Sequence, residues 1–344
     1  MEENKRNELD ELGEFGLIDR ISANFQNRQS STVLGIGDDA AAIDANGQLL
    51  LLSTDMLCEG VHFNLMYAPL KHLGYKAIVS NLSDIYAMNG TPTQVVVSLA
   101  LSNRFSVEAV NELYAGMRKA CDLYEVDLVG GDAASSMAGL VINVAVTGLV
   151  NEADMVKRSG AKKGDLLVVS GDLGSAYMGL QILEREKEVF KAAPSAQPQF
   201  EGFDYMLERQ LKPEARKDVI ELLAQMEVKP SAMIDISDGL ASEALHIAKQ
   251  SKLSVKIYED KLPIDPKTVE TAQEFNLDAT TIALSGGEDY ELLFTISQED
   301  YDKIKGNPSL TVIGYMDEEG IENSLITRSG QAIELTAQGW NHLA

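Results

Sequence analysis

The sequence predicts a two-domain protein of the α/β class, of the α+β type, and three observations support this fold class. The chain has 344 residues, which is long for one average domain and sufficient for two. Strand-like and helix-like segments alternate over roughly the first 150 residues. A similar alternation starts again near Lys157. We therefore expect an N-terminal domain at residues 1–152 and a C-terminal domain at residues 153–344.

Hydrophobic periodicity gives the expected elements of the first half. Apolar residues that recur with the period of a helix predict helices, and short β-branched or apolar runs bounded by turn residues predict strands. The helices are expected at 7–26, 70–88 and 106–124, and the strands at 32–42, 48–55, 93–101, 126–129 and 140–149.

The second half repeats this pattern with one interruption. Residues 187–203 are rich in Ala, Pro, Gln and Ser and show no period, which predicts a surface excursion. The C-terminal piece, 310–344, is expected to form short strands joined by turns. Strands are otherwise expected at 166–170, 232–236, 254–258 and 290–296, and helices after 174 and at 213–226 and 240–250.

Charge and composition exclude several classes of function. The chain has 29 basic and 53 acidic residues, and its net charge of −24 repels nucleic acids and anionic membranes. The first residues lack the apolar core of a signal peptide, and no later stretch resembles a membrane span, so a cytoplasmic location is expected. Cys58 and Cys121 lie far apart and match no zinc or redox spacing, which predicts buried thiols.

Aspartates follow apolar segments in five places. Carboxylates at the ends of strands would converge on one edge of a sheet, where their mutual repulsion favours a bound divalent cation. Mg²⁺ suits such a site because it prefers oxygen ligands and bridges to nucleotide phosphates. For any single segment, a turn or helix cap is the commoner explanation, but five together favour the metal site. The segments contain Asp38 and Asp39, Asp55, Asp84, Asp132, and Asp235 with Asp238.

Two glycine pairs give a second indication. Gly130-Gly131 and Gly286-Gly287 would let a backbone approach a ligand closely. The sequence contains no P-loop, no dinucleotide fingerprint and no protein-kinase motif set. If ATP binds, we expect metals held by aspartates to replace the P-loop.

Seven short motifs occur along the chain: GIGDDA at 35–40, STD at 53–55 with HF at 62–63, KA through NLSD at 76–84, GGD at 130–132, RSGA at 158–161, IDISDGL at 234–240 and SGGEDYEL at 285–292. The combination of GGEDYEL, DISDGL and STD followed by HF is highly specific. Together the motifs resemble those of the thiamine-monophosphate kinase family of aminoimidazole-ribonucleotide-synthetase-like ATPases. They occur in the family's order, and the resemblance runs from about residue 12 to the end of the chain.

The resemblance implies two α/β domains, a homodimer joined through N-terminal strands, and a site for ATP and several Mg²⁺ ions. Catalytic roles fall on Asp55, Asp84 and Arg158. The implied ATP contacts are Gly131, Asp132, Arg158, Ser237 and Tyr124, and the substrate-side residues are His62, Glu288 and Trp340. The implied metal ligands are Asp39, Ser53, Thr54, Asp55, Asp84, Asp132, Asp235 and Asp238.

Some of these residues also have a structural interpretation. Tyr124 is a good core residue, His62 could be a hydrogen-bonded structural histidine, and Trp340 could pack near the C-terminus. Glu288 could belong to a turn, or it could complement a cationic ring of the substrate. The role of Asp38 is open, because one of two adjacent aspartates is often a cap.

The implied reaction is direct transfer of the γ-phosphoryl group of ATP to thiamine monophosphate. The acceptor phosphate is already an anion, so catalysis consists of alignment and charge stabilisation. Another superfamily member that acts on a purine precursor, selenide or a carbamoyl group remains an alternative. The segment before Gly35 contains no Cys for selenide chemistry. A non-catalytic nucleotide or metal sensor is the alternative from a different class.

Overall fold

The computed structural model describes residue 18 and residues 29–337. The first unit is a six-stranded sheet in the order β1-β2-β3-β6-β4-β5. Its strands are β1 (Thr32–Leu34), β2 (Ala41–Asp44), β3 (Leu49–Cys58), β4 (Thr91–Leu101), β5 (Asp127–Ser135) and β6 (Val141–Val150). Neighbouring strands are antiparallel except β4 and β5.

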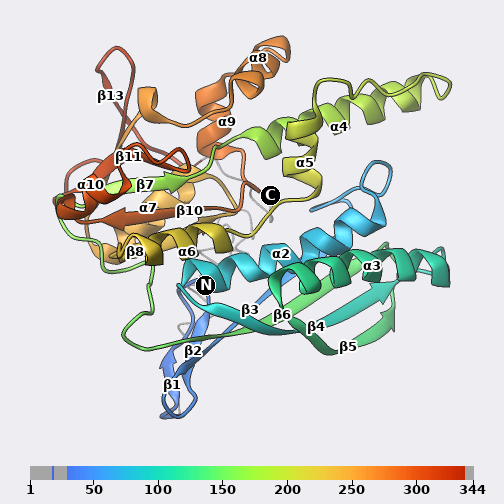
Figure 1. Cartoon of the computed structure of the whole chain (residues 1–344). Coiled ribbons are helices and arrows are strands. Elements are labelled where there is room, and N and C mark those ends of the chain that lie inside the picture. Colours follow the sequence, from blue (N-terminus) through green and yellow to red (C-terminus); the bar gives the residue numbers. More distant parts are fainter. Residues whose placement is uncertain (1–17, 19–28, 338–344) are drawn as a thin grey trace, which may run out of the picture.

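Two long helices cover one face of this sheet. The helices α2 (Leu70–Ala87) and α3 (Val107–Tyr124) lie side by side between the N-terminal sheet and the second unit (Figure 1). Ser106 caps α3, because its side chain accepts a hydrogen bond from the amide of Ala109. Helix α2 is buried from Leu73 onwards except at Asp84, and its buried residues include the polar Lys76 and Asn81.

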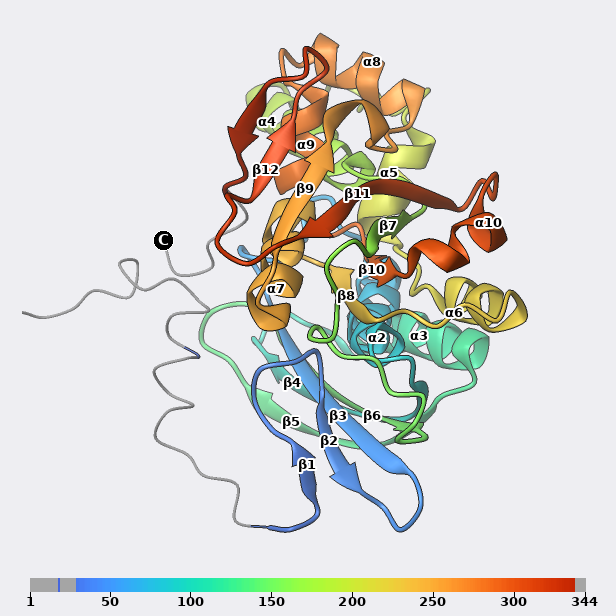
Figure 2. The same cartoon turned by 90° about the vertical axis from the view of Figure 1, so that its left-hand side faces the viewer.

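The second unit contains a seven-stranded sheet in the order β13-β12-β9-β11-β7-β10-β8. Figure 2 shows this sheet above the N-terminal one. Its strands are β7 (Leu166–Ser170), β8 (Ala232–Ile236), β9 (Ser254–Tyr258), β10 (Glu291–Ile296), β11 (Leu310–Asp317), β12 (Ser324–Ile326) and β13 (Ala332–Glu334). All its neighbouring strands are antiparallel except β9 and β12.

Helices cover both faces of the C-terminal sheet. Helix α7 (Leu240–Ser251) packs on one core, and α6 (Lys217–Gln225) and α10 (Tyr301–Ile304) pack on the other. The end of α2 reaches the second unit, because Ala87 packs in the same core as Met233 of β8. The remaining helices are α4 (Ser175–Ala192), α5 (Asp204–Leu211), α8 (Pro266–Glu274) and α9 (Ala279–Ser285). No described helix is long and apolar enough to cross a membrane.

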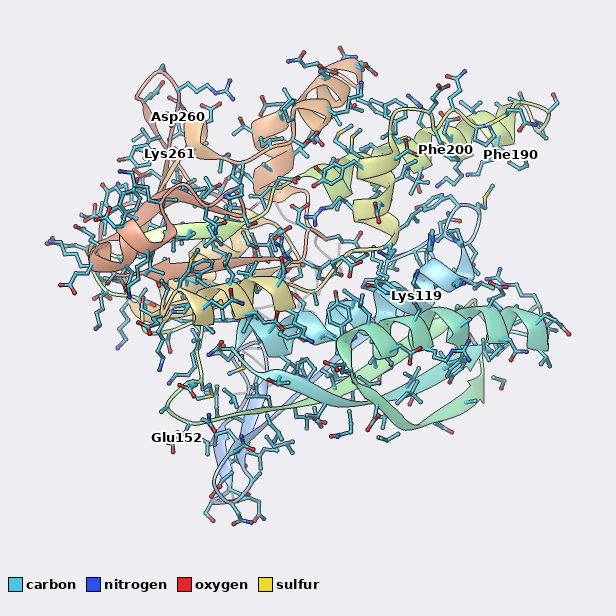
Figure 3. All side chains as sticks on the ribbon, in the orientation of Figure 1. Lys119, Glu152, Phe190, Phe200, Asp260 and Lys261 are labelled. Carbon is cyan, nitrogen blue, oxygen red and sulfur yellow. The ribbon has the colours of Figure 1, made fainter. Side chains whose placement is uncertain are left out.

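The expected α+β class is confirmed, and several boundaries are corrected. The single strand expected at 32–42 is two short strands separated by the loop 35–40. The excursion expected at 187–203 is helical up to Ala192, and Phe190 and Phe200 lie along α4 (Figure 3). Helices α5, α8 and α9 were not expected from the sequence. The helix expected at 7–26 lies almost wholly outside the described residues.

The expectation that the aspartates lie at the ends of strands is wrong for Asp55, Asp84 and Asp132. Asp84 lies on α2, Asp55 lies inside β3 and Asp132 lies inside β5. Asp235 is the penultimate residue of β8, so only this segment and the loop aspartates have the expected placement. The apolar run before Asp55 stops where β3 becomes exposed to solvent, whereas β5 is exposed along its whole length. In both strands, hydrogen bonding to neighbouring strands continues beyond the apolar residues.

Candidate metal and phosphate site

Three carboxylates meet where α2 approaches β8. Asp39 comes from the loop before β2, Asp84 from α2 and Asp235 from β8, and one oxygen of each lies within 4.8 Å of the others. Asp39 and Asp235 are buried, and Asp84 is partly exposed. Residues that are far apart in the sequence therefore form one acidic cluster, as the sequence predicts for these three aspartates.

Burial and mutual repulsion disfavour the charged forms of this cluster. Burial raises the pKa of Asp84, and the charges of Asp55, Asp235 and Asp39 add to the rise. Burial also raises the pKa of Asp235, with a further contribution from Asp39. The pKa of Asp39 is raised by burial, although Arg158 acts in the opposite direction. Such a cluster is stabilised in its ionised form by a cation.

Arg158 is the cation that faces the cluster. Its Nη2 donates to Asp39 Oδ1 at 2.6 Å, and the Arg158 side chain is 17% exposed. The backbone amide of Arg158 donates to both carboxylate oxygens of Asp38, at 3.1 and 3.3 Å. Asp38 therefore holds the Arg158 backbone, and burial together with Asp39 raises its pKa to about 6. This contact gives Asp38 a structural role as an anchor.

The donor set fits Mg²⁺. The second oxygen of Asp39, Oδ2, is buried and has no hydrogen-bond partner within the described part of the chain. A buried carboxylate oxygen without a partner is costly, and a cation would satisfy it. All three side chains offer oxygen, which suits Mg²⁺ better than Zn²⁺ or Cu²⁺.

Strand β3 directs Ser53 and Asp55 towards this cluster. The Ser53 hydroxyl donates to Asp84 Oδ2 at 2.6 Å, and the Asp55 amide donates to Asn81 Oδ1 at 3.0 Å. The charge of Asp55 also contributes to the raised pKa of Asp84. Because side chains alternate along a strand, Ser53 and Asp55 share the face of the sheet that α2 covers.

Thr54 and Asp132 lie on the opposite face of the sheet. Asp132 pairs with Ser98, Ser98 with Asn143, and Asn143 with Met56, and directly paired residues point to the same face. Asn143 donates to the Thr54 hydroxyl on that face at 3.1 Å. Within one chain, these two expected ligands are therefore separated from the cluster by the sheet.

Gly131 has a steric reason to be glycine. A Cβ at this position would lie 1.9 Å from the carbonyl oxygen of Val97 on the neighbouring strand. The close approach that was expected for a ligand is thus made by the backbone of β4.

The segment around Ser237 and Asp238 is tied to the GGED loop. Glu288 donates its amide to the Ser237 carbonyl at 2.6 Å, and a Cβ on Gly287 would lie 2.8 Å from the same oxygen. The amide of Asp238 donates to Glu243 Oε1 at 3.0 Å. Glu243 is buried, and the sequence analysis did not identify it as a site residue. The only signal for it in the sequence is that it is an acidic residue in the first turn of a helix.

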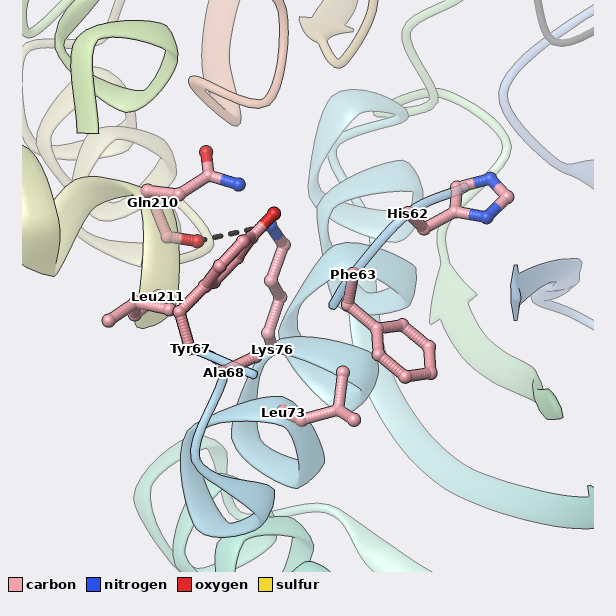
Figure 4. Close-up of a pocket in the computed structure, with 8 residues that line it drawn as sticks. All are labelled: His62, Phe63, Tyr67, Ala68, Leu73, Lys76, Gln210 and Leu211. Carbon is pink, nitrogen blue, oxygen red and sulfur yellow. Dashed lines mark hydrogen bonds between the residues drawn. The ribbon is translucent and has the colours of Figure 1, made fainter. Parts of the chain in front are cut away.

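A small pocket lies beside this loop, between the segment before α2 and the end of α5 (Figure 4). Glu288 forms an ion pair with buried Lys76 at 2.8 Å and accepts a hydrogen bond from Gln210 at 2.7 Å. His62 lines the pocket, and its Nδ1 accepts a hydrogen bond from the Cys58 amide at 3.0 Å. The charge of Glu288 is therefore already compensated by Lys76. Lys76 belongs to a recognised motif, but neither it nor Gln210 received a role from the sequence.

Tyr124 is committed to contacts within the protein. Its hydroxyl donates to Glu214 at 2.7 Å and accepts from the Ala215 amide at 2.9 Å, and its ring is buried. These contacts connect α3 to the chain that leads into α6 and favour the packing role. Trp340 lies outside the described residues.

Comparison with known proteins matches both halves of the chain to one superfamily. The family model "AIR synthase related protein, N-terminal domain" matches residues 37–150, and its C-terminal counterpart matches residues 162–324. A thiamine-monophosphate kinase from Aquifex aeolicus is 37% identical over 339 residues, covering 97% of this chain and 99% of the relative. The chain belongs to the thiamine-monophosphate kinase family.

Further members of this family agree along almost the whole length. The thiamine-monophosphate kinase of Bacillus subtilis is 35% identical over 340 residues, covering 96% of this chain and 99% of the relative. A solved structure described as "AaThiL complexed with AMPPCP and TMP" is 34% identical and superimposes with a TM-score of 0.83, covering 99% of this chain and all of that one. The expected family and two-domain architecture are thereby confirmed.

Proposed function

We propose that the chain transfers the γ-phosphoryl group of ATP to the phosphate of thiamine monophosphate, giving thiamine diphosphate and ADP. The names of the full-length relatives support this activity. The bound molecules named for the similar structure, AMPPCP and TMP, fit an ATP analogue and this acceptor. The observation that carries the proposal is the cluster of Asp39, Asp84 and Asp235 beside Arg158.

The cluster would hold Mg²⁺ through Asp39, Asp84 and Asp235. Ser53 and Asp55 act on Asp84 directly, and Asp238, three residues after Asp235, is proposed to complete the set. Bound there, Mg²⁺ would supply positive charge that offsets the negative charge of the phosphates. The chain itself holds the carboxylates in place: Ser53 orients Asp84, and Arg158 orients Asp39. The requirement for Mg²⁺ and the individual ligands are part of the proposal.

Catalysis in this scheme needs alignment and charge stabilisation rather than a general base, because the acceptor phosphate is already ionised. Arg158 would stabilise negative charge that develops during transfer. Asp55 on β3 and Asp84 on α2 lie on the same side of the N-terminal sheet and would act there together. Ser237 lies in an exposed turn next to Asp238, where it can contact phosphate oxygens. His62, Glu288 and Trp340 are assigned to the acceptor.

The proposed domains are residues 1–152, which carry most of the metal site and the dimer surface, and 153–344, which complete the ATP and acceptor sites. The sheet face opposite α2 exposes Leu52 and Met56 on β3 and Val96 on β4, by 40 to 53%. A homodimer through this face would bury these apolar side chains and cover Asp132 and Thr54 as well. The cytoplasm is the proposed location.

An assay of ADP release tests the proposal directly. The full chain is incubated with ATP and Mg²⁺, with and without thiamine monophosphate, and ADP is measured by a coupled enzyme assay. Release that depends on thiamine monophosphate is expected. Nucleotide binding without turnover would indicate a sensor instead, and ATP hydrolysis that ignores this acceptor would indicate a sister enzyme of the superfamily.

A further inference from the structure

The loop of residues 286–290, which contains the GGED sequence, has an unusual backbone conformation. Gly287, Glu288 and Tyr290 have φ values of 68°, 58° and 50°. Glycine adopts positive φ readily, but residues with a side chain rarely do, and a bulky one such as tyrosine is an outlier there. Such conformations persist only where the surrounding structure enforces them, and they cluster at functional sites. The contacts that hold this loop therefore bear on its function.

The end of strand β8 holds one side of the loop. The Glu288 amide donates to the Ser237 carbonyl at 2.6 Å, and the Tyr290 amide donates to the Ile236 carbonyl at 2.8 Å. These two bonds place the amides of the loop against the turn that follows β8. They leave the carbonyl of the peptide before Tyr290 facing another part of the molecule.

Helix α5, which lies between α4 and α2 (Figure 1), holds the other side of the loop. The Nη2 of Arg209 donates to the Asp289 carbonyl at 3.0 Å. This carbonyl belongs to the same peptide as the Tyr290 amide, so the peptide is held at both ends. The next residue of α5, Gln210, donates from Nε2 to the Glu288 carboxylate at 2.7 Å. Two adjacent residues of α5 therefore contact the backbone of the loop and the side chain that the loop presents.

Arg209 also contacts the buried carboxylate of Glu291, which has a second cation. Glu291 Oε1 lies 3.0 Å from Arg209 Nη2, and Glu291 Oε2 pairs with Arg216 Nη1. The two arginine side chains are almost equally buried, at 12% and 13% exposed. Arg216 also pairs with Asp218 of α6, whereas Arg209 reaches the loop. If Arg209 served only as a counter-ion of Glu291, Arg216 would share its role.

We infer that Arg209 is a positioning residue for the acceptor: it holds the Asp289 carbonyl and thereby fixes the direction in which Glu288 points. The inference rests on the proposed function, which assigns Glu288 to the acceptor. Groups that bind a substrate must be held closely in their productive orientation, because a small displacement costs much of the rate. Without Arg209, the peptide after Asp289 loses one of its two anchors, and the loop relaxes towards ordinary φ values. The bond from Glu288 to Ser237 does not involve Arg209, so the proposed ATP contact at Ser237 keeps its place.

Steady-state kinetics and thermal unfolding of the full chain test this role, with Arg216→Met as the matched control. Arg209→Met and Arg216→Met should both lower Tm, because each leaves Glu291 with one cation fewer. Only Arg209→Met should raise the KM for thiamine monophosphate, by about tenfold, with the KM for ATP changed by less than about twofold. Arg209→Lys keeps a donor for the Asp289 carbonyl and should recover part of this loss.

The outcomes separate the alternatives. A wild type without turnover on thiamine monophosphate overturns the proposed function and this inference with it. Where the wild type turns over, an unchanged acceptor KM in Arg209→Met, or an equal rise in Arg216→Met, overturns the inference alone. A KM for ATP that rises as much as the acceptor KM also overturns it, because the loop would then serve both substrates. If thermal unfolding shows that Arg209→Met does not fold, Arg209→Lys is compared with Arg216→Lys, and a rise in acceptor KM of about threefold is expected only for Arg209→Lys.

Discussion

Replacing Asp84 by Asn should abolish phosphoryl transfer while making the metal-free chain more stable. Asp84, Asp39 and Asp235 bring their oxygens within 4.8 Å of one another, and burial already raises the pKa of each carboxyl group. Substituting a residue that serves packing lowers stability. Substituting a metal ligand that is held close to like charges raises the stability of the metal-free chain, because it removes repulsion.

The size of the gain follows from the separation of the charges. Two unit charges about 4.8 Å apart at an effective dielectric constant of about 20 repel by about 3 kcal/mol. The raised pKa values mean that the cluster is only partly ionised at neutral pH, so we expect a gain of about 1–3 kcal/mol. For a chain of this length, such a gain raises Tm by roughly 1–4 °C.

Thermal unfolding with EDTA and with excess Mg²⁺ measures both effects, together with ADP release at saturating substrates. The wild type should gain stability from Mg²⁺, and Asp84→Asn should lose most of that gain and its turnover. Asp122→Asn, an exposed carboxylate on α3, serves as the matched control and should behave like the wild type. A lower Tm for Asp84→Asn in EDTA, combined with undiminished turnover at saturating Mg²⁺, would refute the reasoning.

Four further predictions follow from the same contacts. Tyr124→Phe should lower the free energy of unfolding by about 1 kcal/mol, because Glu214 loses a hydrogen bond. The KM for ATP should stay unchanged; a raised KM would indicate that Tyr124 contacts the nucleotide after all. Arg158→Met should destabilise the metal-free chain by about 3 kcal/mol by leaving Asp39 unpaired, with calorimetry as the check and an unchanged stability as the contrary result. Met56→Lys should shift the chain from dimer to monomer in light scattering, unless the open sheet face is not the interface. Finally, the pKa values of the clustered carboxyl groups are higher in the folded chain than in the unfolded chain, so the metal-free chain should lose stability as pH rises from about 4 to about 7. The affinity for Mg²⁺ should rise over the same pH range, because Mg²⁺ binds the ionised groups. Equal Mg²⁺ affinities at pH 6 and pH 8 in isothermal titration calorimetry would contradict this.

The sequence predicts the regular part of the fold well. Strands 166–170, 232–236 and 254–258 are found with the expected bounds, because continuous apolar runs between turn residues define buried strands. Helix α5 was missed because it follows a segment rich in Pro and Ala and is short. The ends of β3 and β5 were missed for a different reason, since pairing with neighbouring strands continues where the apolar pattern stops.

The site was predictable in its residue types more than in its geometry. The recurrence of aspartates correctly indicated that Asp39, Asp84 and Asp235 converge. It could not show that Asp132 lies on the other face of the sheet, because strand order is set by pairings that are distant in the sequence. Nor could it reveal the roles of Lys76 and Gln210, which depend on the contact between α2 and α5 across the two units.

The most direct test of the central claim is the product of the reaction. Phosphorus NMR of the full chain with ATP, Mg²⁺ and thiamine monophosphate should show ADP and thiamine diphosphate appearing in equal amounts. With EDTA in place of Mg²⁺, neither product should form. Inorganic phosphate in place of thiamine diphosphate, or equal product formation in EDTA, would contradict the assignment of the aspartate cluster to metal-assisted phosphoryl transfer.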